Sequence, residues 1–243
     1  MFAYLRFEIR RLVREPRLFI FTVLMPVLSY VVFTGVGDLN GQAEGIAVAA
    51  TLMVGMAAYG TIIGVLSIGS GVSVERTSGW LRQLRLTPLP PSRVVAVKAV
   101  LASLTAIPSV ITVGVAGYLQ HGVHLSVGRW VALVGLMWLG TLPFALLGLA
   151  IGYGVAPALA QSVSFLTFFS LSALGGLLVP VAAFPSGLQT VAHLLPSYRY
   201  GELGWKAAAG TLPSLSGTAV LLGWTTAFGA LAALAYRRSA ATR

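Results

Sequence analysis

Long runs without a charged side chain are the feature that most limits how this chain can fold. The first extends from Leu18 to Val36. At about 1.5 Å per residue, a helix of that length crosses the ~30 Å hydrocarbon core of a bilayer. Similar runs recur to the end of the sequence. Together they predict an all-α integral membrane protein with six transmembrane helices, at about 18–36, 46–71, 99–119, 130–152, 162–178 and 216–236.

The composition agrees with this class. Hydrophobic residues make up 57% of the chain and charged residues 9%, and the mean hydropathy is +0.88. The length of 243 residues leaves no room for a separate soluble domain of ordinary size, so we expect one membrane domain covering residues 1–243. Because the sequence has no cysteine, disulfides, thiolate metal sites and cysteine nucleophiles are excluded.

The distribution of basic residues predicts the orientation. Of the 16 Lys and Arg, five precede the first span, five lie between the second and third spans and three follow the last, whereas only Arg129, Arg199 and Lys206 fall on the other side. The positive-inside rule then puts both termini in the cytoplasm, which requires an even number of spans in the cell (inner or plasma) membrane. Anionic lipid accounts for the net charge of +10, so we expect a lipid partner and no nucleic acid.

Residues 2–15 carry apolar and basic side chains on opposite sides of a predicted helix. The apolar side holds Phe2, Leu5, Ile9, Leu12 and Val13, and the basic side Arg6, Arg10 and Arg14. This pattern predicts a helix lying in the membrane interface. A signal peptide would begin similarly, but its apolar core is shorter and no small-residue cleavage site follows, so we expect a retained first span.

Prolines and glycines mark special points within the predicted spans. Pro26 and Pro108 are expected to bend the first and third spans. Two glycine pairs stand one helical turn apart, Gly60 with Gly64 and Gly148 with Gly152. Small residues at that spacing let helices approach closely, although glycine is also common in membrane helices without such a role.

The stretch from Glu75 to Lys98 holds one acid, five bases and three prolines. It must lie in water, because each Lys or Arg costs roughly 2.5–3.5 kcal/mol at the bilayer centre. Between Val74 and Leu86 the apolar side chains Trp80, Leu81 and Leu84 share one side, which predicts a short amphipathic helix that Pro88 ends. We expect a basic surface helix that contacts another protein. The alternative is a passive loop that only obeys the positive-inside rule.

A second unusual stretch runs from Gly175 to Trp205. Pro180, Pro185 and Pro196 divide it into pieces too short to span a membrane, although most of it is apolar. It predicts a re-entrant helical hairpin that dips into the outer leaflet and packs against protein, since broken helices are tolerated at membrane depth only there. Within it, Arg199 and Glu202 are expected to pair.

Both stretches resemble the type-two ATP-binding-cassette export permeases, and the drug- and antibiotic-export branch in particular. The resemblance rests on Glu75-Arg76, Gly79, Leu84, Thr87-Pro88 and Lys98 in the first stretch, on Gly176, Pro180, Pro185, Pro196 and Tyr198 in the second, and on Pro26 in the first span. Members often carry more acid after the Glu-Arg pair, where this chain has Thr77 and Ser78. The likeness covers nearly the whole chain.

The resemblance implies a permease subunit without a catalytic or metal site, coupled through residues 74–98 to an ATPase. The coupling residues would be Glu75, Arg76, Gly79, Trp80, Leu81, Leu84, Arg85, Thr87 and Pro88, with Glu75 and Arg76 pairing with charges on the ATPase. It also implies two cytoplasmic ATPase subunits that bind ATP and Mg²⁺, and a second permease, identical or similar. Pro26 and Ser170, in the first and fifth spans, would mark the permease dimer interface.

The sequence itself argues against an enzyme. There is no G-x-x-x-x-G-K-[ST], because the two lysines follow Val97 and Trp205, so this chain cannot cradle ATP phosphates. A membrane protease would need a Ser–His pair, for which Ser70 and His193 are the candidates, but no G-x-S-x-G turn supports them. His121 and His124 are three residues apart without a third metal ligand and are predicted to be loop histidines.

The rival function is an ion-coupled carrier, which would place acidic or His residues within its spans. All six acids lie outside the predicted spans, so we expect the energy to come from a separate ATPase. A channel or scaffold would not need so structured a cytoplasmic contact. The apolar, charge-poor interior favours an amphipathic substrate such as a drug, an antibiotic or a lipid, with a polysaccharide or glycolipid as the second choice.

Overall fold

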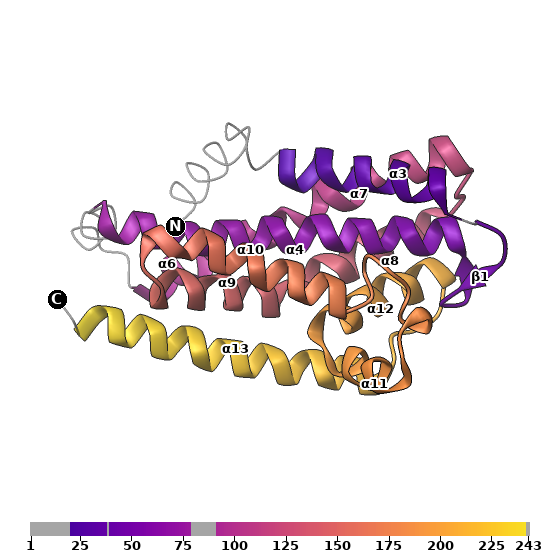
Figure 1. The fold of residues 1–243 in the computed structure, drawn as a ribbon. Coiled ribbons are helices and arrows are strands. Elements are labelled where there is room, and N and C mark those ends of the chain that lie inside the picture. The colour runs from indigo at the N-terminus through magenta and orange to yellow at the C-terminus, as the bar shows by residue number, and fades with distance from the viewer. Residues whose placement is uncertain (1–19, 38, 79–90, 242–243) are drawn as a thin grey trace.

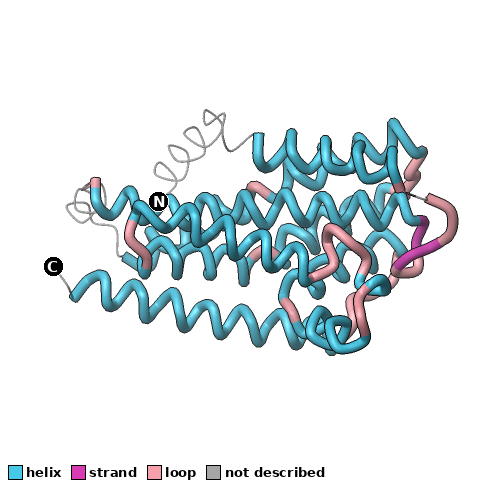
Figure 2. Tube along the Cα trace, viewed as in Figure 1, coloured by secondary structure: helices cyan, strands magenta, loops and turns pink. Residues whose placement is uncertain are grey.

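Helix α4, Val48–Thr77, runs through the middle of the structure and is surrounded by the other helices (Figure 1). The computed structural model describes residues 20–37, 39–78 and 91–241. In this part of the chain nearly all regular structure is helical, as Figure 2 shows by colour. Helices α3, α7, α9, α10 and α12 all pack on α4, which is why most of its side chains are buried.

The remaining elements follow in chain order. They are the π-helical turn η1 (Ile20–Leu24), α3 (Met25–Val36), β1 (Gln42–Ala43), β2 (Ile46–Ala47), α6 (Pro91–Leu104), α7 (Ala106–His121), α8 (Val127–Gly140), α9 (Leu142–Gly154), α10 (Pro157–Leu174), the 3-10 turn η2 (Val181–Ala183), α11 (Ser186–Leu194), α12 (Pro196–Ala209) and α13 (Leu215–Ala241).

Five helical segments of the described chain are long and apolar enough to cross a membrane. They are Val48–Thr77, Ala96–His121, Val127–Gly154, Pro157–Leu174 and Leu215–Ser239, and they correspond to the second to sixth predicted spans. The first predicted span is represented by a shorter apolar helix, Thr22–Val36. Its expected beginning at Leu18, like the interfacial helix over 2–15, lies outside the described residues. The all-α membrane class is therefore confirmed, whereas the first span, and with it the total of six, stays a prediction.

Two predicted boundaries were wrong. The second span was expected to end near Gly71, but the helix α4 continues to Thr77, so Glu75 and Arg76 lie in its last turn. The fifth was expected from Ser162 to Leu178, but α10 begins at Pro157 and ends at Leu174. Proline is well suited to the first turn of a helix, where its missing N–H is not needed.

The third and fourth spans are each interrupted near their midpoint. The break between α6 and α7 is at Thr105, three residues before Pro108, where a bend was expected. An unexpected break between α8 and α9 is at Thr141, two residues before Pro143. In each case the proline removes the N–H that would continue the helix. At each break the threonine hydroxyl donates to the carbonyl three residues earlier, Ala102 O or Trp138 O, at 2.7 Å.

The two glycine pairs predicted to permit close helix contacts do so. A Cβ on Gly152 would lie 2.3 Å from the carbonyl oxygen of Gly69, so the backbones of α4 and α9 touch. A Cβ on Gly60 would lie 2.2 Å from Cγ of Pro26, and one on Gly64 would lie 2.1 Å from Cγ2 of Thr22. Glycine is therefore required at these crossings because there is no room for any side chain.

We expect Gly69→Ala to destabilise the protein by about 1–3 kcal/mol, since a Cβ there would lie 2.4 Å from the backbone of Gly148 and the two helices would have to separate. The midpoint of thermal unfolding in detergent measures the loss. Gly71→Ala on the same helix is the matched control, because nothing lies within 4 Å of its Cβ position. Equal midpoints for the two variants would contradict the close crossing.

A short β-hairpin and a broken segment lie at one end of the bundle, the hairpin end. The hairpin pairs β1 with β2 through a turn at Glu44 and Gly45, both with positive φ, as tight hairpin turns require. Its Ala43 carbonyl accepts a hydrogen bond from the Thr51 hydroxyl at 2.7 Å. The broken segment, predicted over 175–205, consists of η2, α11 and α12 and continues to Ala209. Each of its helical pieces begins at or just after a proline, as expected.

Candidate functional site

The opposite end of the bundle, the basic end, holds a buried ion pair. Glu75 in the last turn of α4 accepts a hydrogen bond from Lys98 in α6, with 2.7 Å between Oε1 and Nζ. The two side chains are only 10% and 5% exposed. These residues stand just before and just after the segment 79–90, so the ion pair ties the two flanks of that segment together.

Arg76, the next residue, points to the end of a different helix. Its Nη1 donates to the Tyr153 carbonyl, and its Nη2 donates to the Val155 carbonyl at 3.2 Å. The last carbonyls of a helix have no partner within the helix and carry a partial negative charge. A cation at this position stabilises a helix by about 0.3–1 kcal/mol, and by up to ~2 kcal/mol when partly buried. Arg76 therefore caps the C-terminus of α9.

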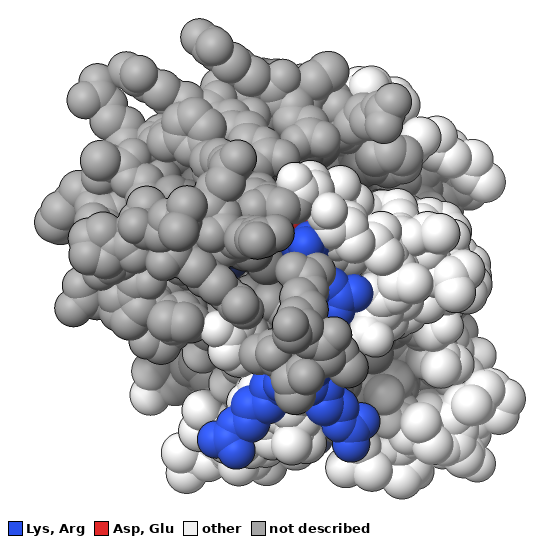
Figure 3. All heavy atoms as spheres, turned by 90° about the vertical axis from the view of Figure 1, so that its left-hand side faces the viewer, with Lys and Arg blue, Asp and Glu red and all other residues white. Residues whose placement is uncertain are grey.

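A small apolar cluster lies beneath these charges and brings in α13. It contains Val72, Leu149, Tyr153 and Ala232, and the Tyr153 ring meets the Tyr236 ring edge-on, with 5.2 Å between centroids. Four helices, α4, α6, α9 and α13, thus meet at the basic end. Figure 3 faces this end, and the described arginine and lysine side chains visible there are blue. The exposed Arg237 and Arg238 follow Tyr236 on α13.

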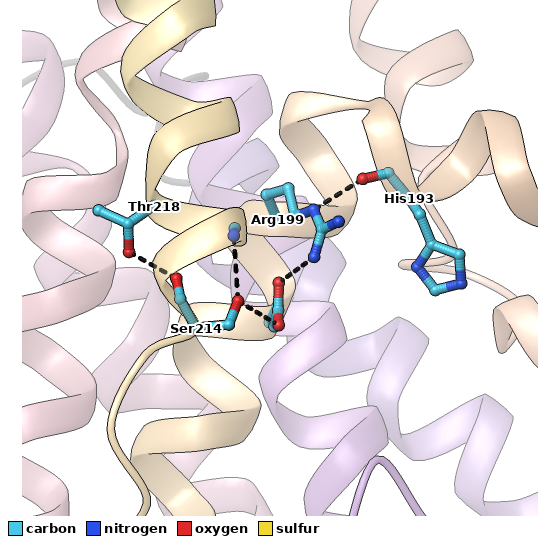
Figure 4. Close-up of polar contacts among 6 residues, drawn as sticks. His193, Arg199, Ser214 and Thr218 are labelled. Carbon is cyan, nitrogen blue, oxygen red and sulfur yellow. Dashed lines mark hydrogen bonds and ion pairs between the residues drawn. The ribbon is translucent and has the colours of Figure 1, made fainter.

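The hairpin end carries a polar cluster of its own (Figure 4). The expected pair is confirmed: Arg199 Nη1 lies 2.8 Å from Glu202 Oε2, one turn apart on α12. Arg199 Nε also donates to the His193 carbonyl at 2.7 Å, and Ser214 donates to the other carboxylate oxygen of Glu202 at 2.8 Å. The cluster therefore joins the end of α11, the first half of α12 and the residue before α13.

Aromatic side chains connect this cluster to the bundle. The Tyr198 ring packs edge-on against His193 at 4.4 Å and against Trp205 at 5.7 Å. The indole N–H of Trp205 donates to the Thr51 carbonyl at 3.1 Å, so α12 is held to the first turn of α4. The broken segment is consequently packed on protein along α12, while the apolar Leu188, Val191 and Leu194 of α11 remain exposed.

Comparison with known proteins decides the family. Residues 1–203 match the sequence profile described as ABC-2 type transporter, which is well over half of the chain. The chain belongs to this family. It is also 26% identical over 225 residues to the "Putative transport permease YvfS" of Bacillus subtilis (strain 168), a match covering 91% of this chain and 90% of that protein. An ABC-2 protein is a membrane component of a transporter, not itself an ATPase, and generally works with a cytoplasmic ABC ATPase.

In this ABC-2 chain the predicted coupling residues divide into two groups. Gly79, Trp80, Leu81, Leu84, Arg85, Thr87 and Pro88 lie outside the described residues, so their roles stay predictions. The other two, Glu75 and Arg76, belong to α4 rather than to a separate helix from Val74 to Leu86. Their expected pairing with charges on an ATPase stays a prediction, and the contacts described above lie within the chain. Both bind partners within the chain, because a charge at the end of a buried helix needs a partner close by.

The predicted residues of the broken segment lie where the backbone turns. Gly176 has φ +73°, a value that favours glycine, and a Cβ on it would lie 2.3 Å from Val181 Cγ2. Pro180 and Pro185 precede η2 and α11, and Pro196 is the first residue of α12. These positions explain why such residues occur here, and they assign no role in transport.

The two residues predicted for a dimer interface differ in exposure. Pro26 is buried against Gly60 rather than exposed on an outer face of the described chain, and its role at a dimer interface stays a prediction. Its packing against a glycine explains its place in the first span. Ser170 is exposed on α10 beside Phe169. The hydroxyls of that helix do not share one face, because Ser164 and Ser172 are buried.

The remaining candidates have ordinary structural contacts. Ser70 donates to the Ser67 carbonyl and, at 3.4 Å, to Gln161 Oε1, whereas His193 packs on Tyr198 at the hairpin end, so the possible protease pair is not assembled. His121 and His124 each pack edge-on against a tyrosine ring. Sequence reasoning missed Tyr153, Val155 and Ser214 as partners, because two act through backbone carbonyls and the third is an unremarkable loop serine.

Proposed function

We propose that this protein is the permease subunit of an ATP-driven exporter whose ATPase is a separate polypeptide that contacts segment 79–90. The observation that carries this proposal is the arrangement at the basic end. Glu75 and Lys98 join the two flanks of the segment through a buried ion pair, and Arg76 joins its start to α9. A partner that moves the segment would therefore move several membrane helices together.

The proposed assembly has two permeases, identical or similar, and two cytoplasmic ATPases that bind ATP and Mg²⁺. Six spans make a thin wall for a pathway, and a two-fold pair would put the pathway on the dimer axis. The substrate proposed is an amphipathic drug, antibiotic or lipid. A polysaccharide or glycolipid is the second choice, and the charge-poor composition of the membrane helices favours the first.

The ion-coupled alternative is weakened by the surroundings of the acids that the structure describes. Glu75 lies within α4, contrary to expectation, but its carboxylate is balanced by Lys98 rather than offered to a driving ion. Glu202 is likewise held by Arg199. Glu44 is in the hairpin turn outside the helices.

Transport in inside-out vesicles tests the proposal. The permease is expressed with the ATPase encoded nearest to it, and uptake of a fluorescent amphipathic dye is followed with and without ATP. We expect uptake that requires ATP and is blocked by vanadate. Uptake that does not depend on ATP and is abolished by a protonophore would instead indicate an ion-coupled carrier.

The proposed orientation puts the basic end and both termini in the cytoplasm. Single cysteines can be introduced freely, because the chain has none. In intact cells an impermeant thiol reagent should label Asn40→Cys at the hairpin end and should not label Ser239→Cys near the end of α13. The reverse pattern of labelling would refute the orientation.

The proposed dimer interface includes α10, whose outer face exposes Phe165, Leu166 and Phe169 together with Ser170. We expect Ser170→Cys to form an oxidative cross-link between two permeases. Leu231→Cys on α13 is the control, since it is 50% exposed on a helix that we propose faces lipid. Cross-linking of the control alone would show that the dimer uses another face.

A further inference from the structure

The side chain of Arg76 holds the turn between α9 and α10. Its two nitrogen atoms donate to the carbonyls of Tyr153 and Val155, which lie 77 and 79 residues further along the chain. These residues flank Gly154, the last residue of α9, and only Ala156 separates Val155 from Pro157, where α10 begins. The side chains of Val155 and Ala156 cannot form hydrogen bonds, so the two carbonyls are the groups of this turn that bond to Arg76 on α4.

Helix α10 is attached to α4 more than to its neighbour in sequence. It packs extensively on α4 and only slightly on α9, although α9 leads directly into it. A second polar contact joins the same two helices, from the Ser70 hydroxyl to Gln161 Oε1 at 3.4 Å. The beginning of α10 is thus connected to the last turns of α4 at two levels, Arg76 with Val155 and Ser70 with Gln161.

We infer that Arg76 is the positioning residue that carries movement of segment 79–90 to α10. The inference rests on the proposed function, in which an ATPase moves that segment. Helix α4 is continuous from Val48 to Thr77, so displacement at its end moves Arg76 directly. The planar guanidinium can bond two carbonyls at once, which an ammonium group cannot do in the same way. The Glu75–Lys98 ion pair carries the same movement to α6 by a separate route.

The two routes can be separated with spin labels in the complete complex. Single cysteines are placed at Leu159 on α10 or Val100 on α6, both exposed, and labelled in permease–ATPase complex reconstituted in lipid nanodiscs. The measured quantity is the change in the electron paramagnetic resonance spectrum when ATP and vanadate are added. In the otherwise unaltered protein both labels should respond.

In Arg76→Gln the response at position 159 should be largely lost, because the two charge-assisted hydrogen bonds to the turn are lost, while the response at position 100 persists. Arg237→Gln removes an equal charge from the same end and should leave both responses intact. If Arg76→Gln retains both responses, Arg76 is not on the route to α10. If it loses both while the ATPase still co-elutes, Arg76 only supports the fold, and the inference is overturned.

Arg76→Lys is a second test of the inference, and it can be used even if Arg76→Gln does not assemble with the ATPase. Its ammonium keeps the charge but not the fork, so the response at position 159 should fall relative to that at position 100. If the labels at positions 159 and 100 respond as strongly in Arg76→Lys as in the unaltered protein, the two-carbonyl contact of the guanidinium is not needed, and the inference is overturned. If neither label responds in the unaltered protein, the proposed ATPase coupling itself fails. That outcome is seen without any Arg76 variant, so it is distinct from failure of the inference.

Discussion

Replacing Lys98 by methionine should lower the free energy of unfolding by about 3–5 kcal/mol, because the carboxylate of Glu75 would stay buried after losing the positive charge that lies against it. The side chains are 5% and 10% exposed, and the charged atoms lie 2.7 Å apart, so water cannot readily take the place of the lysine. The shift in the midpoint of unfolding by sodium dodecyl sulfate, for protein purified in a mild detergent, measures the effect. Arg237→Met is the control, since Arg237 is exposed at the same end.

The double variant Glu75→Gln/Lys98→Met distinguishes a lost charge partner from lost packing. It leaves no uncompensated charge, so it should recover most of the stability that Lys98→Met loses. If the double variant is as unstable as Lys98→Met, the packing of the lysine stem is what matters. Glu75→Ala should also reduce stability, because it removes the carboxylate that pairs with the buried Lys98. As a predicted coupling residue, Glu75 should in addition be needed to link ATP hydrolysis to transport.

The second large effect is expected in segment 79–90. Trp80→Ala and Leu84→Ala should each weaken binding of the ATPase by at least about 2 kcal/mol, or roughly 30-fold in Kd, because buried aromatic and apolar anchors dominate such interfaces. Arg82→Ala should cost only about 0–1 kcal/mol, as expected for a charge at the rim. The measurement is the amount of ATPase that co-elutes with the permease, followed by transport in vesicles. Unchanged assembly and transport in the Trp80 and Leu84 variants would leave only a passive loop.

Much of the fold could be predicted because it depends on local properties. Uncharged runs identify the membrane helices, and prolines mark where the helical pieces after Gly175 begin. Gly148 with Gly152 marks a close helix contact. Each of these signals acts within one or two turns of helix. The break at Thr141 has the same kind of cause, Pro143, and closer attention to that proline would have found it.

The end of α4 could not be predicted in this way. A hydropathy scale assigns Glu75 and Arg76 each a separate free-energy cost in a membrane helix and takes no account of their partners. In the structure Lys98 balances the first, and the C-terminus of α9 binds the second. Both partners are distant in sequence, and one is a pair of backbone carbonyls, which any residue could supply. The candidate site therefore depended on long-range contacts that only the folded chain reveals.

The two interrupted spans have a further consequence for how this protein fits its bilayer. Each break lies near the midpoint of its span, so α6 with α7 and α8 with α9 form two pairs of short helices, each pair joined by a single threonine, Thr105 or Thr141. A straight helix meets a thinner or thicker bilayer by tilting along its whole length. These jointed spans can instead bend at the threonines, so we expect the permease to tolerate bilayers of different thickness with little change at either surface.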